Sequence, residues 1–117
     1  MISGVLVFNG NAELIISRFY KADYSKLAAE AFRIKIVASK NYGSPCVLLD
    51  RSSFMFIRVG DLIVTAVTKA NANVALVFSF LYQLVTVFRS YFEGEFTEEK
   101  IRSNFVLVYE LFDEVMD

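Results

Sequence analysis

Apolar and polar positions divide the chain into five short apolar segments and three longer segments with helical periodicity. The short segments are apolar on both of their alternating faces and span residues 2–8, 14–19, 46–50, 54–59 and 62–68. Strands with two apolar faces belong to a sheet that is covered on both sides, by helices or by a second sheet. We therefore predict five buried strands.

Turn residues connect these strands in pairs. Asn9-Gly10 follows the first segment and is a strong hairpin signal. Gly60-Asp61 lies between the fourth and fifth segments, with Gly first, as a type II′ turn prefers. Two tight hairpins predict a largely antiparallel sheet.

The first helical segment runs from about Tyr24 to Lys40, with Asp23 as its probable N-cap. Its apolar face is predicted to comprise Tyr24, Leu27, Ala28, Ala31, Ile34 and Ala38. Three basic residues, Lys26, Arg33 and Lys40, recur every seventh position away from that face. We interpret them as a solvated stripe, with weak contact to anionic lipid headgroups as the functional alternative.

The second helical segment, about residues 73–92, is apolar nearly all round, and Asn71 and Asn73 lie at its start, where a helix cap belongs. Before Arg89 its only polar line is formed by Ser79, Gln83 and Thr86, and Ser90 continues it. One small sheet cannot cover such a helix, so the remainder requires another helix, another subunit or lipid. A membrane span needs roughly 20 apolar residues, and the polar residues within this run disfavour that alternative.

The third helical segment begins at the predicted cap Thr97 and continues toward residue 117. Its apolar stripe is predicted to comprise Ile101, Phe105, Val108, Phe112 and Val115. Glu110, Asp113 and Glu114 gather near its carboxyl end, where carboxylates oppose the helix dipole. Either a partner supplies basic groups there or the native helix continues, and we expect the chain to be a fragment of a longer protein.

The predicted fold is therefore α+β, an α/β sandwich with the element order β-β-α-β-β-β-α-α. Its composition offers little chemistry. The 117 residues carry a net charge of −1, no histidine and the single cysteine Cys46. A balanced charge disfavours a nucleic-acid partner, and without histidine or a motif we expect no zinc site, no catalytic site and no cofactor.

Several blocks of the sequence resemble the amino-terminal domain of clathrin adaptor medium (mu) subunits. Residues 104–117 (NFVLVYELFDEVMD) resemble the end of that domain, and residues 98–105 (EEKIRSNF) fit the same pattern. Residues 70–92 resemble its long second helix, and ISRFYKAD (16–23) with AFR (31–33) resemble its beginning. The features ISRFY, AFR, Ser44-Pro45 and residues 51–54 are most similar to adaptor complex two, whereas LVFSFLYQLVTVF is also similar to the Golgi and endosomal complex one.

This resemblance implies a longin-like fold, in which a five-stranded antiparallel sheet carries one helix on one face and two on the other. It also implies a place in the core of a heterotetramer, mainly against the beta-type large subunit, with the second large subunit and the small sigma subunit completing the core. Clathrin would be an indirect partner. The location would be cytoplasmic, on the cytosolic face of the plasma membrane at coated pits or of Golgi and endosomal membranes. Tyr-based cargo signals are read in this family by a separate carboxyl-terminal domain, which we expect to be absent from this chain.

Under this interpretation the candidate subunit interface has two parts. The first lies on the second helix and comprises Leu76, Ser79, Gln83, Thr86, Val87 and Ser90, and the second comprises Glu110, Asp113 and Glu114. The alternatives are a longin-domain SNARE or related trafficking regulator, and a small enzyme of unknown chemistry.

Overall fold

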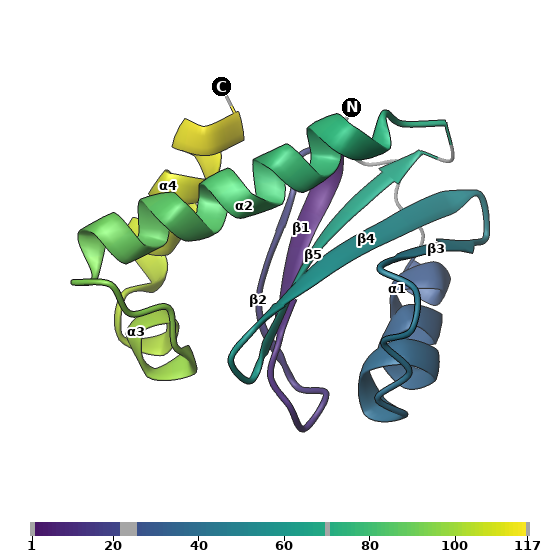
Figure 1. Cartoon of the computed structure of the whole chain (residues 1–117), viewed down its shortest axis with the longest axis horizontal. Helices are drawn as coiled ribbons and strands as arrows, with labels where there is room; N and C mark the ends of the chain where they lie inside the picture. The colour runs from purple at the N-terminus through teal and green to yellow at the C-terminus, as the bar shows by residue number, and fades with distance from the viewer. Residues whose placement is uncertain (1, 22–25, 70, 117) are drawn as a thin grey trace.

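The five apolar segments form one antiparallel sheet in a computed structural model that describes residues 2–21, 26–69 and 71–116 (Figure 1). The strands are β1 (Ile2–Phe8), β2 (Leu14–Phe19), β3 (Cys46–Leu49), β4 (Ser52–Val59) and β5 (Leu62–Lys69). Their order is β2-β1-β5-β4-β3, and every neighbouring pair is antiparallel. The prediction of an antiparallel sheet is confirmed.

Helices cover both faces of this sheet. The first is α1 (Lys26–Phe32), which continues as the π-helical segment η1 (Arg33–Ala38) and packs on one face. The opposite face carries α2 (Val74–Tyr91), α3 (Glu98–Ser103) and α4 (Phe105–Met116). The longin-like layering is confirmed, although the described chain has four α-helices where three were predicted.

Phenylalanines dominate the core on each face. Against α1, the ring of Phe32 stacks on Phe54 at 4.9 Å and meets Phe56 edge-on at 5.7 Å. Beneath α2, the ring of Phe88 stacks on Phe96 at 4.9 Å and lies 5.5 Å from Phe112. Because each core is aromatic and closely packed, the two faces bury the apolar strand residues that the sequence pattern predicted.

The strand connections follow the sequence signals in part. Val59 pairs with Leu62, and Gly60 has a φ of 58°, as a type II′ turn requires. The β1–β2 hairpin is also present, but its loop spans residues 9–13, and Ala12 rather than Gly10 takes the positive φ (62°). The Asn9 side chain shapes this loop, since its Oδ1 accepts the backbone N–H groups of Asn11 (2.9 Å) and Glu13 (3.0 Å).

The first helix differs from its prediction in its buried face. Leu27 and Ile34 are exposed, and the buried residues are Ala28, Phe32, Ile36 and Val37. After Phe32 the cause is the π-helical segment, because i→i+5 bonding brings residues five apart, such as Phe32 and Val37, to the same side. Leu27 precedes that segment and lies outside the face that Ala28 and Phe32 bury. The expected cap Asp23 and the face residue Tyr24 lie outside the described residues.

The predicted third helix is two helices with a break at Asn104. Thr97 caps α3, as predicted, by accepting the Lys100 N–H at 3.3 Å. Asn104 ends α3, with a backbone φ of −140° and its side chain donating to the Lys100 carbonyl at 2.8 Å. The break shifts the helical phase, so Phe105 is exposed, and Leu111 joins Val108 and Phe112 in the core.

The β3–β4 turn generates the first prediction. Asp50 and Arg51 both have positive φ (47° and 64°), which together make a type I′ turn without glycine. Substituting Arg51→Gly relieves the left-handed strain, and we expect the free energy of unfolding to rise by about 0.5–1 kcal/mol in urea denaturation. Arg51→Ala is the matched control and should give no gain; equal stability of the Gly and Ala variants would contradict this turn geometry.

The buried Asn9 side chain generates the second prediction. Besides its two accepted bonds, its Nδ2 donates to Glu13 Oε1 and Glu98 Oε1, each at 3.1 Å, and the residue is buried. We expect Asn9→Ala to lower the free energy of unfolding by about 2 kcal/mol, because the hydrogen bonds that shape the loop and tie it to Glu98 are lost. Asn11→Ala, in the same loop but exposed, should change it little, and a similar loss in both variants would argue against the Asn9 network.

Candidate interaction surface

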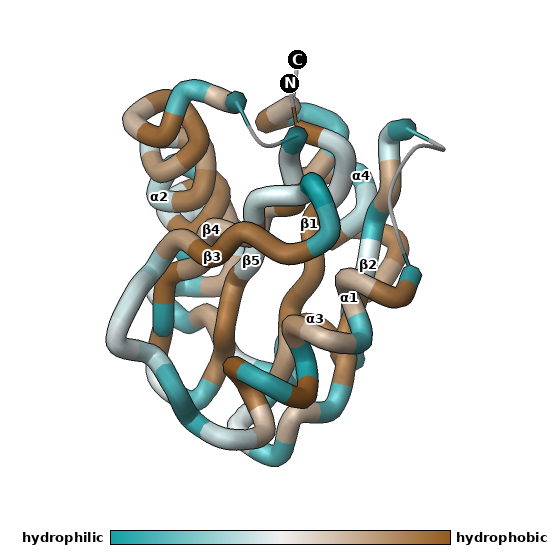
Figure 2. Tube along the Cα trace, turned by 90° about the vertical axis from the view of Figure 1, so that its right-hand side faces the viewer, coloured by the Kyte–Doolittle hydropathy of each residue, from teal (hydrophilic) through white to brown (hydrophobic). Residues whose placement is uncertain are grey.

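The α2 helix buries one face and leaves the rest uncovered. Asn73 caps it, as predicted, by accepting the Leu76 N–H at 3.2 Å. Its buried residues are Val77, Phe80, Leu81, Leu84, Val85 and Phe88. Apolar residues nevertheless recur around the helix (Figure 2), so part of its apolar surface faces outward. Among the described helices, α2 alone is long and apolar enough to cross a membrane, a test that the core helix of a soluble protein also passes.

The outward side of α2 carries the predicted uncharged polar line. Ser79, Gln83, Thr86 and Ser90 are all exposed. The Thr86 hydroxyl donates to the Tyr82 carbonyl at 2.9 Å, and the Ser90 hydroxyl donates to the Val87 carbonyl at 2.7 Å. Because these hydroxyl protons are already bonded within the helix, the line is compatible with a closely packed, weakly polar contact.

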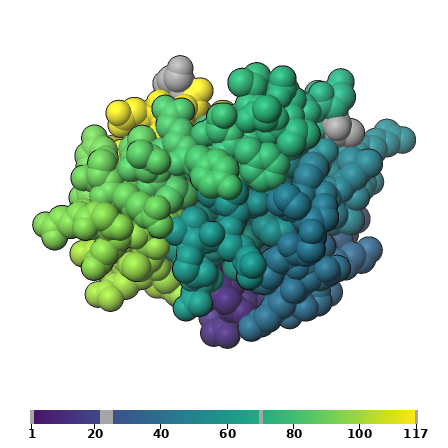
Figure 3. Space-filling view, viewed as in Figure 1, coloured from purple at the N-terminus to yellow at the C-terminus, as the bar shows by residue number. Residues whose placement is uncertain are grey.

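Large apolar side chains flank this line. Leu76 and Tyr82 are 56% and 61% exposed, and Val87 is half-buried. No charged residue occurs in α2 before Arg89, and α2 crosses the upper part of the face shown in Figure 3. On α4, Val106 is 74% exposed. Exposed apolar surface of this kind marks contacts with other proteins or with membranes.

The three acidic candidates do not form one cluster. Asp113 accepts two hydrogen bonds from the Arg18 guanidinium, at 3.2 and 3.1 Å, and so links α4 to β2. Glu110 and Glu114 are exposed. Beside the pair lies Tyr20, whose buried hydroxyl has no hydrogen-bond partner among the described residues, and burial followed by the nearby Asp113 charge raises its pKa. Asp113 thus has a structural partner within the chain.

The three basic candidates are also separated. Lys26 is exposed, whereas Arg33 pairs with Glu30 one turn away. Lys40 lies beyond the helix, with a φ of 56°, near Asn9 and Asp61. They do not form a continuous helical stripe, because the helix ends at Ala38.

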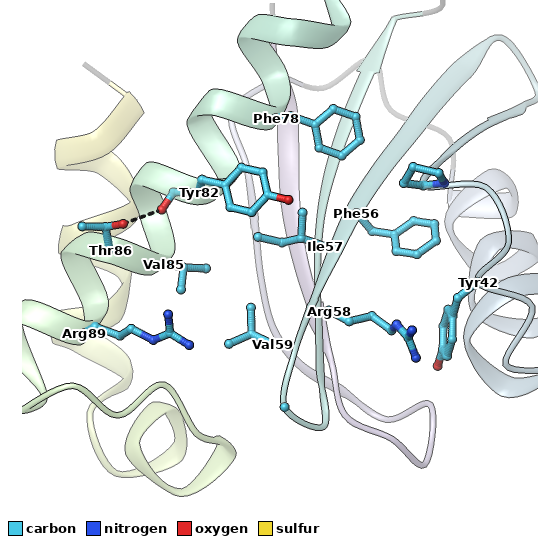
Figure 4. Close-up of a pocket in the computed structure, with 12 residues that line it drawn as sticks. Tyr42, Phe56, Ile57, Arg58, Val59, Phe78, Tyr82, Val85, Thr86 and Arg89 are labelled. Atoms are coloured by element: carbon cyan, nitrogen blue, oxygen red, sulfur yellow. Dashed lines mark hydrogen bonds between the residues drawn. The ribbon is translucent and has the colours of Figure 1, made fainter.

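A groove between α2 and β4 was not predicted from the sequence. It has a volume of about 700 Å³ and is lined on one side by Phe78, Tyr82, Val85, Thr86 and Arg89. The opposite side is formed by Tyr42, Pro45 and the end of β4, residues 56–60. Figure 4 shows Phe78, Tyr82 and Arg89 reaching from α2 toward β4, with Arg58 beside Tyr42. The Arg58 guanidinium lies 4.7 Å from the centre of the Tyr42 ring. The sequence signal available for this groove was Pro45, because a proline cannot donate a backbone hydrogen bond to a neighbouring strand.

Within residues 2–21, 26–69 and 71–116, no group of three His, Cys, Asp or Glu side chains is placed so that it could hold a metal ion. Cys46 is a half-buried free thiol.

Comparison with known proteins gives consistent relatives. No family model matches the chain. The whole chain is 45% identical to the AP-2 complex subunit mu of Dictyostelium discoideum and 41% identical to that of Caenorhabditis elegans. Over 98% of its length it is 41% identical to the AP-1 complex subunit mu-2 of Bos taurus. The chain spans about a quarter of the length of these curated relatives (26%, 26% and 27%).

Solved structures agree on the fold. The chain superposes with a TM-score of 0.75 on a chain of a homology model of the full-length AP-3 complex in a stretched open conformation, covering 100% of this chain and 82% of that one. On a chain of a homology model of the same complex in an intermediate open conformation, it superposes with a TM-score of 0.71, covering 97% of this chain and 28% of that one. Identity is 17% in both, so these matches support the fold alone. The 41–45% identity to the curated relatives identifies the chain with the amino-terminal part of the adaptor-complex medium (mu) subunit family, and the structural matches agree with its longin-like fold.

Proposed function

We propose that this domain is a structural part of a heterotetrameric clathrin adaptor complex and assembles the adaptor core by binding large subunits, mainly the beta-type one. The small sigma subunit and the second large subunit would belong to the same core, and clathrin would be reached indirectly. The observation that carries the proposal is the uncharged, partly apolar outer face of α2 in a chain that is 45% identical to an AP-2 mu subunit.

The physical argument concerns the area that α2 leaves open. An 18-residue helix is about 27 Å long, and each Å² of apolar surface removed from water contributes about 25 cal/mol. Leu76 and Val87 would supply apolar area, and Ser79, Gln83 and Thr86 would supply short polar contacts along the same side. A second polypeptide lying along α2 would therefore gain stability without having to neutralise any charge before Arg89.

The proposal assigns no reaction to the domain. Under the proposal this domain does not itself read Tyr-based cargo signals. The location would be the cytosolic face of the plasma membrane at coated pits, with Golgi or endosomal membranes as the alternative. Complex two is favoured over complex one by the first relatives, at 45% and 41% against 41%. Lipid contact through Lys26, Arg33 and Lys40 stays a prediction. The Glu30 carboxylate that pairs with Arg33 reduces the net positive charge available for such a contact.

The polar line gives a direct test of assembly. We expect the double substitution Ser79→Arg and Gln83→Arg to reduce co-purification with a co-expressed beta-type large subunit at least tenfold, because two long cations would separate the surfaces. The unfolding free energy of the isolated chain should change by no more than about 0.5 kcal/mol, since both sites are exposed. Ser103→Arg, at an exposed position of α3, is the matched control. Undiminished co-purification of the double variant would refute this interface.

The acidic residues allow docking to be separated from folding. Replacing Glu110 and Glu114 with Gln should weaken co-purification and leave the isolated chain's stability unchanged, because both carboxylates are exposed. Asp113→Asn should instead lower that stability by up to about 1 kcal/mol, as expected for a partly exposed ion pair. If the Glu variant assembles normally, the carboxyl end of α4 is not part of the interface.

A further inference from the structure

The outer edge of β4 is paired over only half its length. β3 pairs with β4 from Leu49–Ser52 to Cys46–Met55. The next contact is a single bond, from the Phe56 N–H to the Pro45 carbonyl at 2.9 Å. Proline has no N–H, so it cannot return a bond to the Phe56 carbonyl. Pairing along this edge therefore ends at Pro45.

The backbone of Arg58 faces the same open edge. Backbone groups of successive strand residues alternate between the two edges, and the Phe56 N–H already points toward β3. The groups of Ile57 and Val59 consequently point toward β5, where these residues pair with Val64 and Leu62. Within the described chain no residue bonds the Arg58 N–H or C=O on the outer side. Gly43 and Ser44, which precede Pro45, are exposed rather than laid against β4.

The open edge lies in the groove beneath α2 (Figure 4). Ile57 and Val59 of β4 lie on the side of the strand that faces α2. Across the groove from them, α2 contributes Phe78, Tyr82 and Val85. On the other face of the strand, Arg58 lies over Tyr42. A strand added at this edge would alternate its side chains between an apolar wall on the α2 side and a cationic, aromatic wall on the Arg58 side.

The charge of the groove is one-sided. Its described lining contains Arg58 and Arg89 but neither Asp nor Glu. Both arginines are exposed, and the ion pairs found in the described chain involve other cations. The groove is therefore complementary to carboxylate groups as well as to apolar side chains.

We propose that the open edge of β4, with the groove beneath α2, binds an extended peptide segment of a partner protein in which carboxylate and apolar side chains alternate. The segment adds a strand outside β4 beyond Pro45, so that its backbone bonds the Arg58 N–H and C=O. Its carboxylates lie toward Arg58, and its apolar side chains lie toward Phe78 and Tyr82. This activity goes beyond core assembly, because the groove is lined mainly by the flank of α2 that bears Phe78, Tyr82, Val85 and Arg89, and Thr86 is the residue of the outward polar line that also borders it.

The probe is a fluorophore-labelled, acetylated and amidated peptide, Glu-Leu-Glu-Leu-Glu-Leu, titrated with the 117-residue chain and followed by fluorescence anisotropy. Peptides with Lys in place of Glu, or with the six residues regrouped as Glu-Glu-Glu-Leu-Leu-Leu, should bind at least tenfold more weakly. Arg58→Ser and Arg89→Ser should each weaken binding about threefold, as for solvent-exposed ion pairs. Ser79→Arg, on the outward polar line, should leave binding unchanged and so separates this site from the proposed subunit interface.

Backbone methylation of the peptide distinguishes strand addition from simple charge attraction. In an added strand only alternate amides face β4. N-methylation of one alternate set of peptide amides should therefore abolish binding, and methylation of the other set should be tolerated. On the protein, Arg58→Pro removes the outward N–H and should abolish binding, whereas Arg58→Ser keeps it; circular dichroism checks that the Pro variant is folded, and the methylated peptides test the proposal even if it is not.

Three results would overturn the proposal. The first is no saturable binding of the alternating peptide, and the second is binding that is equally sensitive to methylation of both amide sets. The third is an edge occupied by a second copy of this chain, seen as a dimer in sedimentation that Arg58→Pro dissociates. Each result is independent of co-purification with a large subunit, so the peptide site and the proposed function can fail separately.

Discussion

The structure depends on a mismatch between the apolar surface of α2 and the area available to cover it. The 18-residue helix α2, which carries no charge before Arg89, lies over one face of a five-stranded sheet. The sheet, with α4 alongside, covers the side bearing Leu81, Leu84 and Phe88, and it leaves Leu76 and Tyr82 in solvent. A longer sheet or further helices could close this gap within one chain. In this fold a neighbouring polypeptide is the simplest way to cover the exposed apolar surface of α2. Such a surface is physically consistent with a family whose members are subunits of complexes.

Three sides of α2 make different contacts. The side toward the sheet builds the aromatic core around Phe88, and the outward side carries the uncharged line of Ser79, Gln83 and Thr86. The third side, with Phe78, Tyr82 and Arg89, forms one wall of the groove against β4. Residues on each side of α2 recur with the same helical spacing, and each set is shifted by about one residue from the next. One repeating sequence pattern therefore specifies the core, the proposed subunit contact and the proposed peptide site.

The sequence predicted well whatever depends on local periodicity. The strands, the caps Asn73 and Thr97 and the Gly60 turn were all recognisable, because each rests on a few neighbouring residues. It predicted poorly whatever depends on helix phase over a longer range. The π-helical turns after Phe32 place Ile34 in solvent, and the break at Asn104 does the same to Phe105. The groove was not predicted, although Pro45 was a signal for it, because its shape depends on β3 beginning only at Cys46 while β4 continues to Val59. The Arg18–Asp113 pair joins residues 95 positions apart, and no local pattern indicates it.

The central claim is that the outward side of α2 becomes covered when the domain joins a large subunit. The most direct measurement is the labelling rate of a thiol placed there, using Gln83→Cys in a Cys46→Ser background and a maleimide reagent. The isolated chain should react at the rate of an exposed cysteine, and the chain in complex with a beta-type large subunit should react at least tenfold more slowly. An unchanged labelling rate in the intact complex would show that this side of α2 stays in solvent, and it would contradict the account.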